Sequence, residues 1–140
     1  MTLDVTICKL IPINQPQNNV MNPSYDVIQC PNVHENICDP KHTYWPNESY
    51  RSGNSIGLRR FFLVHTEYTY SAMTDSPQHQ DICIAYIKPR IREINELHVD
   101  IKLCRSVNEY AEDLDRMKWF KYWCNKAVEL YDNEAAIMFS

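Results

Sequence analysis

Glycine is scarce in this sequence of 140 residues, which contains only Gly53 and Gly57. No stretch approaches the roughly 18 apolar residues that a membrane-spanning helix needs, and residues 1–5 lack the basic and apolar regions of a secretory signal. Walker, dinucleotide-binding and HExxH motifs and a nucleophile elbow are missing as well. These absences predict a cytoplasmic protein with no membrane partner and no cofactor, and they favour a protein that is not an enzyme.

A surplus of positive charge is also lacking, because 14 Lys and Arg stand against 18 Asp and Glu, for a formal net charge of −4. Nucleic-acid binders neutralise phosphates with clustered basic side chains, so we expect no DNA or RNA partner. The six cysteines are scattered through a chain that is 44% hydrophobic, enough to fold without disulfides. We therefore expect a single domain over residues 1–140 with buried, reduced thiols.

Proline divides the chain into unlike parts, since six of eight prolines precede residue 47 and none follows Pro89. Residues 2–9 alternate apolar and polar side chains, as a half-buried strand does. Residues 10–24 are expected to form a loop and 25–29 a second strand. A last strand over 135–139 would neighbour the first. The predicted fold class is α+β, with a long loop-rich N-terminal half and a small sheet packed by two or three helices.

Two helices are expected after Pro89, over residues 89–103 and 106–131. Ser106 and Glu109 form a capping box, which opens the second helix. Its predicted apolar face consists of Tyr110, Leu114, Met117, Phe120, Cys124, Ala127 and Tyr131.

The 106–131 helix carries two further clusters of side chains. Acidic residues in its first turns are favoured by the helix dipole, which we take as their whole explanation; they are Glu109, Glu112, Asp113 and Asp115. Aromatic residues encircle its middle, namely Trp119, Phe120, Tyr122 and Trp123. The helix is therefore either deeply buried or joined to a partner subunit, and the second option predicts a homo-oligomer through residues 106–131.

Both glycines lie in residues 49–62, together with Ser, Asn and three arginines. Glycine permits positive φ and close approach to a ligand, and guanidinium groups suit phosphate or carboxylate. A helix that starts near 55–57 would add free N–H groups, whereas a strand over 61–70, or a glycine turn beside surface arginines, would not. The candidate ligand-binding residues are Tyr50, Arg51, Ser52, Gly53, Asn54, Ser55, Gly57, Arg59, Arg60, Phe61, His79 and Asp81.

Metal binding has a weak sequence signal in the loop-rich half. Cysteine and histidine alternate at every fourth residue, as Cys30, His34, Cys38 and His42. Zinc accepts these residue types, but its sites use closer pairs, and intervening prolines exclude a single helix. We therefore predict no metal there. Lone histidines such as His65 and His98 could be general bases, although such residues are more often ordinary surface or core histidines.

The chain resembles a family of small uncharacterised proteins of bacteriophages and bacteria. Its members begin Met-Gly-Leu-Asp-(Ile/Leu)-Thr, carry a central Arg-Ala-Gly-Ser-Tyr-Ser-Gly-Tyr-Asn-x-Trp-Arg segment and a later Ser-Asp-Cys-Glu-Gly segment, and end in a long helix plus a short strand. The counterparts here are residues 1–6, 51–61, 81–83 and 109–140, with Lys88-Pro89 opening a helix.

Within these motifs Arg51, Gly53, Gly57 and Asp81 match position by position. The resemblance implies a helix after Gly57 and a phage and host setting, hence the host cytoplasm. Together with the residues, it predicts a phage-type binding protein that sequesters a small anionic ligand, such as a nucleotide immune signal, without catalysis.

Two other functions remain open at this stage. The first is a protein–protein inhibitor or structural module that acts through the aromatic helix near Trp119 and Trp123. The second is a small hydrolase that uses His79 and Asp81, a fair candidate polar pair.

Overall fold

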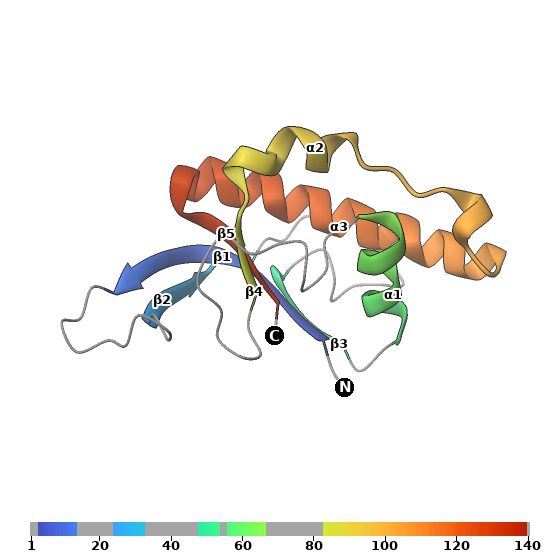
Figure 1. Cartoon of the computed structure of the whole chain (residues 1–140), viewed down its shortest axis with the longest axis horizontal. Coiled ribbons are helices and arrows are strands. Elements are labelled where there is room, and N and C mark those ends of the chain that lie inside the picture. The colour runs from blue at the N-terminus through green and yellow to red at the C-terminus, as the bar shows by residue number, and fades with distance from the viewer. Residues whose placement is uncertain (1–2, 14–23, 33–47, 54–55, 67–82, 140) are drawn as a thin grey trace.

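A computed structural model describes residues 3–13, 24–32, 48–53, 56–66 and 83–139. Among these residues, five strands form one antiparallel sheet in the order β2-β1-β5-β4, with β3 also paired to β1 (Figure 1). The strands are β1 (Leu3–Ile13), β2 (Ser24–Gln29), β3 (Tyr50–Gly53), β4 (Cys83–Tyr86) and β5 (Ala135–Phe139). As predicted, the first and last strands are neighbours.

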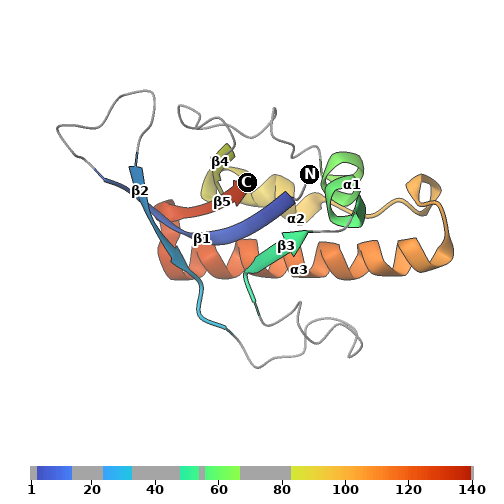
Figure 2. The same ribbon diagram turned by 90° about the horizontal axis from the view of Figure 1, so that it is seen from below.

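The helices are α1 (Ile56–His65), α2 (Ile91–Glu96) and α3 (Val107–Tyr131). Three short 3-10 helices accompany them: η2 (Lys88–Arg90) directly before α2, η3 (Ile101–Leu103) between α2 and α3, and η4 (Asp132–Glu134) between α3 and β5. Helix α3 packs on β1 and β5, while α2 lies along it and α1 contacts its first half and β3 (Figures 1 and 2). The α+β class is thus confirmed. None of the helices described here has the length and apolar character needed to cross a membrane.

Strand β1 is paired along both of its edges. Residues 5–9 pair with β5, and the other edge pairs first with β3 and then, over residues 8–13, with β2. The loop predicted for 10–24 is therefore wrong for its first four residues, because β2 supplies them with a partner strand. Pro12 is tolerated in β1 because β5 pairs only with residues 5–9. At position 12 no hydrogen bond to β5 is lost through the missing N–H of proline.

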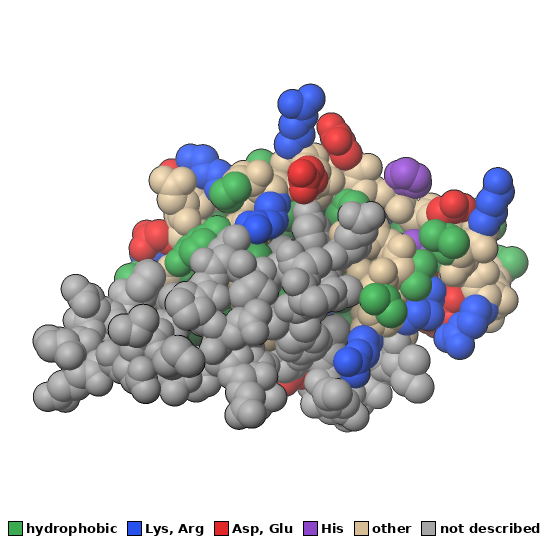
Figure 3. All heavy atoms as spheres, viewed as in Figure 1, with side chains coloured by type: hydrophobic (Ala, Val, Ile, Leu, Met, Phe, Trp, Pro, Cys, Tyr) green, Lys and Arg blue, Asp and Glu red, His purple; other side chains and the backbone are tan. Residues whose placement is uncertain are grey.

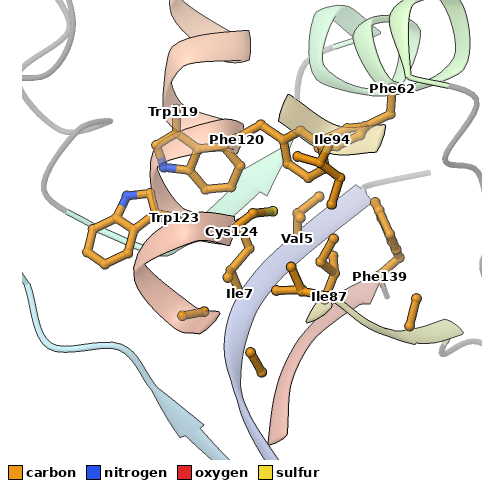
Figure 4. Packing of buried hydrophobic residues seen from close by; sticks show 14 of the residues in the cluster. Val5, Ile7, Phe62, Ile87, Ile94, Trp119, Phe120, Trp123, Cys124 and Phe139 are labelled. Atoms are coloured by element: carbon orange, nitrogen blue, oxygen red, sulfur yellow. The ribbon is translucent and has the colours of Figure 1, made fainter. Parts of the chain in front are cut away.

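The main core lies between the sheet and α3. Val5 and Ile7 of β1 face Phe120 and Cys124 of α3, and side chains of α1, α2, β4 and β5 complete the cluster (Figure 4). Cys8 and Leu10 on the opposite face of β1 are buried too, with Ile84 and Ala136. The prediction of a half-buried first strand is therefore wrong, because both of its faces are covered.

The helix predicted over residues 89–103 is interrupted. The chain leaves the helical conformation at Leu97, which is extended with ψ 144°, and η3 starts only after Asp100. The Asp100 side chain accepts a hydrogen bond from the Lys102 N–H, a local bond that competes with a continuous helix.

The helix predicted over residues 106–131 is confirmed as α3. The Ser106 side chain accepts from the Glu109 N–H, as the capping box requires. The Glu109 carboxylate bonds the N–H of Arg105, one residue before the expected position.

Candidate functional site

Asp113 of α3 is the centre of a buried charged cluster between α1 and α3. It is 0% exposed. Its Oδ1 accepts a hydrogen bond from Arg116 Nη1 at 2.6 Å, and its Oδ2 accepts from Arg60 of α1. His65 Nε2, at the end of α1, lies 3.1 Å from the same Oδ2. One carboxylate thus holds two guanidinium groups and an imidazole in place.

This cluster corrects the predicted face of α3. Leu114, expected in the apolar stripe, is 37% exposed, whereas Asp113, Asp115 and Arg116 are buried. The helix-dipole explanation is wrong for Asp113, because the dipole acts only within the first turn and Asp113 bonds Arg60 and Arg116 instead.

The dipole explanation still fits Glu109, which lies in the first turn of α3. Hydrogen bonds from the backbone and the guanidinium of Arg105 lower its pKa. Its Oε1 also lies 3.2 Å from Arg60 Nη2, so that Arg60 bridges Glu109 and Asp113.

Cys104 lies at the edge of the cluster, directly after η3. Its Sγ is 3.6 Å from Asp113 Oδ2 and 3.9 Å from His65 Nε2. Desolvation is the largest cause that raises the pKa of this thiol, and the hydrogen bond to Asp113 is the second. The thiol therefore stays protonated and donates to the carboxylate. A carboxylate oxygen, a ring nitrogen and a sulfur therefore converge within 4.8 Å of one another.

Gly57 does not adopt a positive φ, and neither does Gly53. The absence of a side chain at residue 57 matters instead for packing. Gly57 lies in the first turn of α1, and a Cβ there would be 2.6 Å from Arg116 Nη2. The buried Arg116 guanidinium thus fits against the start of α1 only because residue 57 has no side chain.

The glycine- and arginine-containing segment folds as β3 followed by α1, so the helix alternative is confirmed over residues 56–65. Arg51 lies in β3 opposite Val5, and its guanidinium is 6.0 Å from the centroid of the Trp119 ring. Tyr50 is partly exposed and Arg59 exposed.

Two of the predicted ligand-binding residues have side chains that are already engaged within the protein. Phe61 is fully buried against Phe62 and His65, so it offers no face on which a base could stack. Arg60 is held by its ion pairs.

Several other candidates lie outside the residues whose side chains are described. Ser52 and Gly53 belong to β3, and for these two residues only the backbone is described. Asn54, Ser55, His79, Asp81, His34, Cys38 and His42 lie wholly outside the described residues. The last metal candidate, Cys30, is buried in the core, where burial raises the pKa of its thiol to about 11 and Sγ donates to the Ile7 carbonyl.

Burial also raises the thiol pKa of two further cysteines, Cys8 and Cys124. Cys8 and Cys124 are buried free thiols, as predicted, and burial raises the pKa of Cys8 to about 12.

The tryptophans of α3 are also buried: Trp119 and Trp123 are both 0% exposed. Their rings pack within this chain and present no surface to a partner.

A surface pocket of about 630 Å³ lies elsewhere, lined by Tyr86, Pro89, Arg90, Glu93 and Asn133. It is formed around η2 and the start of α2, away from α1, and shares no residue with the Asp113 cluster.

Comparison of the chain with protein-family models, curated proteins and solved structures found no significant match. The resemblance to the phage family remains a prediction from the motifs alone.

Proposed function

We propose that the protein binds a small anionic ligand, without turning it over, where β3 and the start of α1 meet α3. The observation that carries the proposal is the contact between Gly57 and the Arg116 guanidinium. This contact brings a fixed positive charge to the first turn of α1, whose N–H groups themselves favour anions. No acidic side chain lies in that turn to neutralise them.

Arg51 supplies the second cation of the proposed site. Arg116 and Trp119 are three residues apart on α3 and so share one face of the helix. Because the Arg51 guanidinium lies over the Trp119 ring, it is on the same face as Arg116. Two planar guanidinium groups near a helix N-terminus suit a phosphate better than a single point charge does.

The charges around this location are mixed, because Arg116 also pairs at 3.4 Å with Glu112, whose side chain is 51% exposed. Asp113 is enclosed by Arg60 and Arg116 and is 0% exposed, so it repels an incoming anion less than a surface carboxylate does. Several Lys and Arg side chains lie on the surface over α1 and the start of α3, interspersed with acidic ones (Figure 3). Arg60 supports the site by holding Asp113.

The ligand class follows from these groups and from the resemblance. Guanidinium groups and helix N–H groups recognise phosphate oxygens. Tyr50 precedes Arg51 in β3, so its ring points to the opposite face of the strand and does not line the face over Trp119. A nucleotide of host immunity fits this chemistry and the phage setting of the similar family.

Calorimetric titration with linear and cyclic nucleotides, with inorganic phosphate as the minimal probe, tests the proposal. Arg51→Ala should weaken binding roughly ten- to a hundredfold by removing a charge-assisted contact, while the protein still folds. Gly57→Ala should weaken it too, because the added methyl displaces the Arg116 guanidinium.

Arg92→Ala is the matched control, since the side chain of Arg92 is 92% exposed and pairs with Glu96 one turn further along α2. It should bind like the unmodified chain. Absence of heat with every nucleotide at roughly tens of micromolar protein, a range in which micromolar affinity is measurable, would contradict the proposal.

Self-association is a second candidate function, favoured by one specific observation. Large apolar side chains are exposed on α1, on η3 and at the start of α3: Leu63 is 64% exposed, Ile101 54%, Leu103 52% and Val107 76%. Exposed apolar residues that gather in one region often mark an interface. Sedimentation velocity should then show a dimer that Val107→Asp dissociates, while a monomer at all concentrations would exclude this role.

A further inference from the structure

We propose that His65, Cys104 and Asp113 bind one divalent transition-metal ion, with Zn²⁺ as the preferred ion. The ion would lie at the end of α1, whereas the proposed anion site lies at its start. The two sites share Asp113, whose Oδ1 accepts from Arg116 and whose Oδ2 would bind the ion. It is built from described residues and is independent of the cysteines and histidines at positions 30–42.

The distances between the three ligand atoms lie within a few tenths of an ångström of those around a tetrahedral ion. Nε2 of His65 is 3.1 Å from Oδ2 of Asp113, and Sγ of Cys104 is 3.9 Å from Nε2 and 3.6 Å from Oδ2. Zinc bonds of about 2.0–2.3 Å at tetrahedral angles separate neighbouring ligand atoms by about 3.3–3.6 Å. A triangle with the observed edges has a circumscribed radius of about 2.1 Å, so an ion can lie at bonding distance from all three atoms at once.

The ligands come from elements that hold them firmly. His65 ends α1 and its side chain is buried; Asp113 lies in the second turn of α3. Cys104 ends η3, and its N–H bonds the Ile101 carbonyl. The three ligand atoms are therefore close together before the ion arrives, which reduces the ordering cost of binding.

The donor chemistry selects zinc among common ions. A thiolate, an imidazole and a carboxylate are ligands that Zn²⁺ accepts together, whereas Mg²⁺ and Ca²⁺ require oxygen ligands. Binding of the ion releases the Cys104 proton to solvent, and the resulting thiolate and the Asp113 carboxylate balance the charge of a divalent cation. Cys104 is only partly buried, so solvent reaches the cluster from its side and can occupy a fourth position.

Arg60 competes with the ion for Asp113. Its guanidinium donates to Oδ2, the oxygen that the ion would use, but Glu109 Oε1 lies 3.2 Å from the same Nη2. An incoming ion therefore displaces Arg60 toward Glu109. Removing the guanidinium should raise metal affinity, an effect that a purely structural cluster would not show.

Cobalt substitution tests the site on the full chain. The protein is stripped with a chelator and titrated with Co²⁺ while absorbance is recorded; one ion per chain with a thiolate-to-metal charge-transfer band and strong visible bands is expected. Cys104→Ser should abolish the charge-transfer band and weaken Zn²⁺ binding roughly a hundredfold or more in chelator competition. Arg60→Gln should bind Zn²⁺ more tightly than the unmodified chain.

Cys8→Ala is the matched control, because it removes a thiol from the opposite face of the sheet and should keep the full band. Cys104 is partly exposed, so its serine variant is expected to fold, which circular dichroism checks. Absence of a stoichiometric band, or a band that survives in Cys104→Ser, would overturn the proposal. Arg51→Ala should leave cobalt binding intact and Cys104→Ser should leave nucleotide binding intact, so the metal and anion proposals fail separately.

Discussion

The two halves of α3 are buried by different chemistry. From Met117 onward, the buried side chains are apolar and pack on β1 and β5. Before Met117, the buried side chains are Asp113, Asp115 and Arg116. Asp113 forms ion pairs with Arg60 of α1 and with Arg116. One continuous helix thus joins an apolar core to a charged interior.

The difference teaches what each half needs in order to stay buried. Apolar burial is non-directional and gains free energy in proportion to the area removed from water. Buried charges are stable only while each keeps its partners. The apolar half should therefore resist small changes of side-chain chemistry, whereas the charged half depends on single atoms such as Oδ1 and Oδ2 of Asp113.

The largest expected effect is in the apolar half. Trp123→Ala should destabilise the protein by about 4 kcal/mol, because it leaves a large cavity in the main core. Urea or thermal unfolding measures the loss, and Leu130→Ala is the control from the same half of α3, since Leu130 is exposed. A loss below about 1 kcal/mol would show that the core collapses around the missing ring.

A somewhat smaller loss is expected from the charged half. Asp113→Ala, measured with a chelator present, should cost about 3 kcal/mol because it leaves the Arg60 and Arg116 guanidinium groups without their shared carboxylate. Glu112→Ala is the control, because that side chain is half exposed and contributes only a weak pair. If both variants unfold alike, the two guanidinium groups have found other partners, and the contrast between the halves is lost.

The start of α3 gives the next effect in size. Ser106→Ala removes the side-chain oxygen that accepts from the Glu109 N–H and should cost about 1 kcal/mol. Because Glu109 also pairs with Arg60, the loosened first turn should raise hydrogen exchange in the charged half before the apolar half. Equal exchange in both halves would mean that α3 opens as one unit.

The smallest effect is expected at the other end of α3, where Asp132 adopts φ 51° and pairs with Lys88. Hydrogen bonding from Lys88 lowers the pKa of Asp132, so this pair stabilises the fold at neutral pH and ceases to do so as pH falls through that lowered pKa. Asp132→Asn should lower the melting temperature slightly at pH 7, by less than Ser106→Ala does. Asparagine tolerates positive φ, so the variant tests the charge alone.

Salt provides the control for this last comparison. Both side chains of the pair are largely exposed, so high ionic strength should remove the difference between Asp132→Asn and the unmodified chain. A difference that persists at acid pH or in high salt would point to the backbone rather than to the ion pair.

The apolar half of α3 could be predicted from the sequence because periodicity and capping are local signals. Ser106 and Glu109 indicate its start, and Phe120, Cys124 and Ala127 recur at helical spacing and are buried. Neighbouring strands at the two ends of the chain followed from the same kind of pattern. The interruption at Leu97 was missed, because an apolar period continues across it while the Asp100 side chain favours a different local bond.

The charged cluster could not be predicted in this way, because its members are distant in sequence. Cys104 and His65 are 39 residues apart, and Asp113 is nine residues beyond Cys104. One signal was present nonetheless. Asp113 and Arg116 continue the buried stripe of Met117 and Phe120 at helical spacing, and opposite charges on a buried stripe indicate partners elsewhere in the fold.

The position of β5 between β1 and β4 also bears on how the chain folds. The pairing of Cys8 with Ala136 joins residues 128 positions apart, which gives the sheet a high contact order and a large loop-closure entropy. Until β5 is in place, β1 and β4 present unpaired edges that include apolar residues such as Ile7 and Ile84. The chain is therefore most prone to aggregate before β5 is added to the sheet.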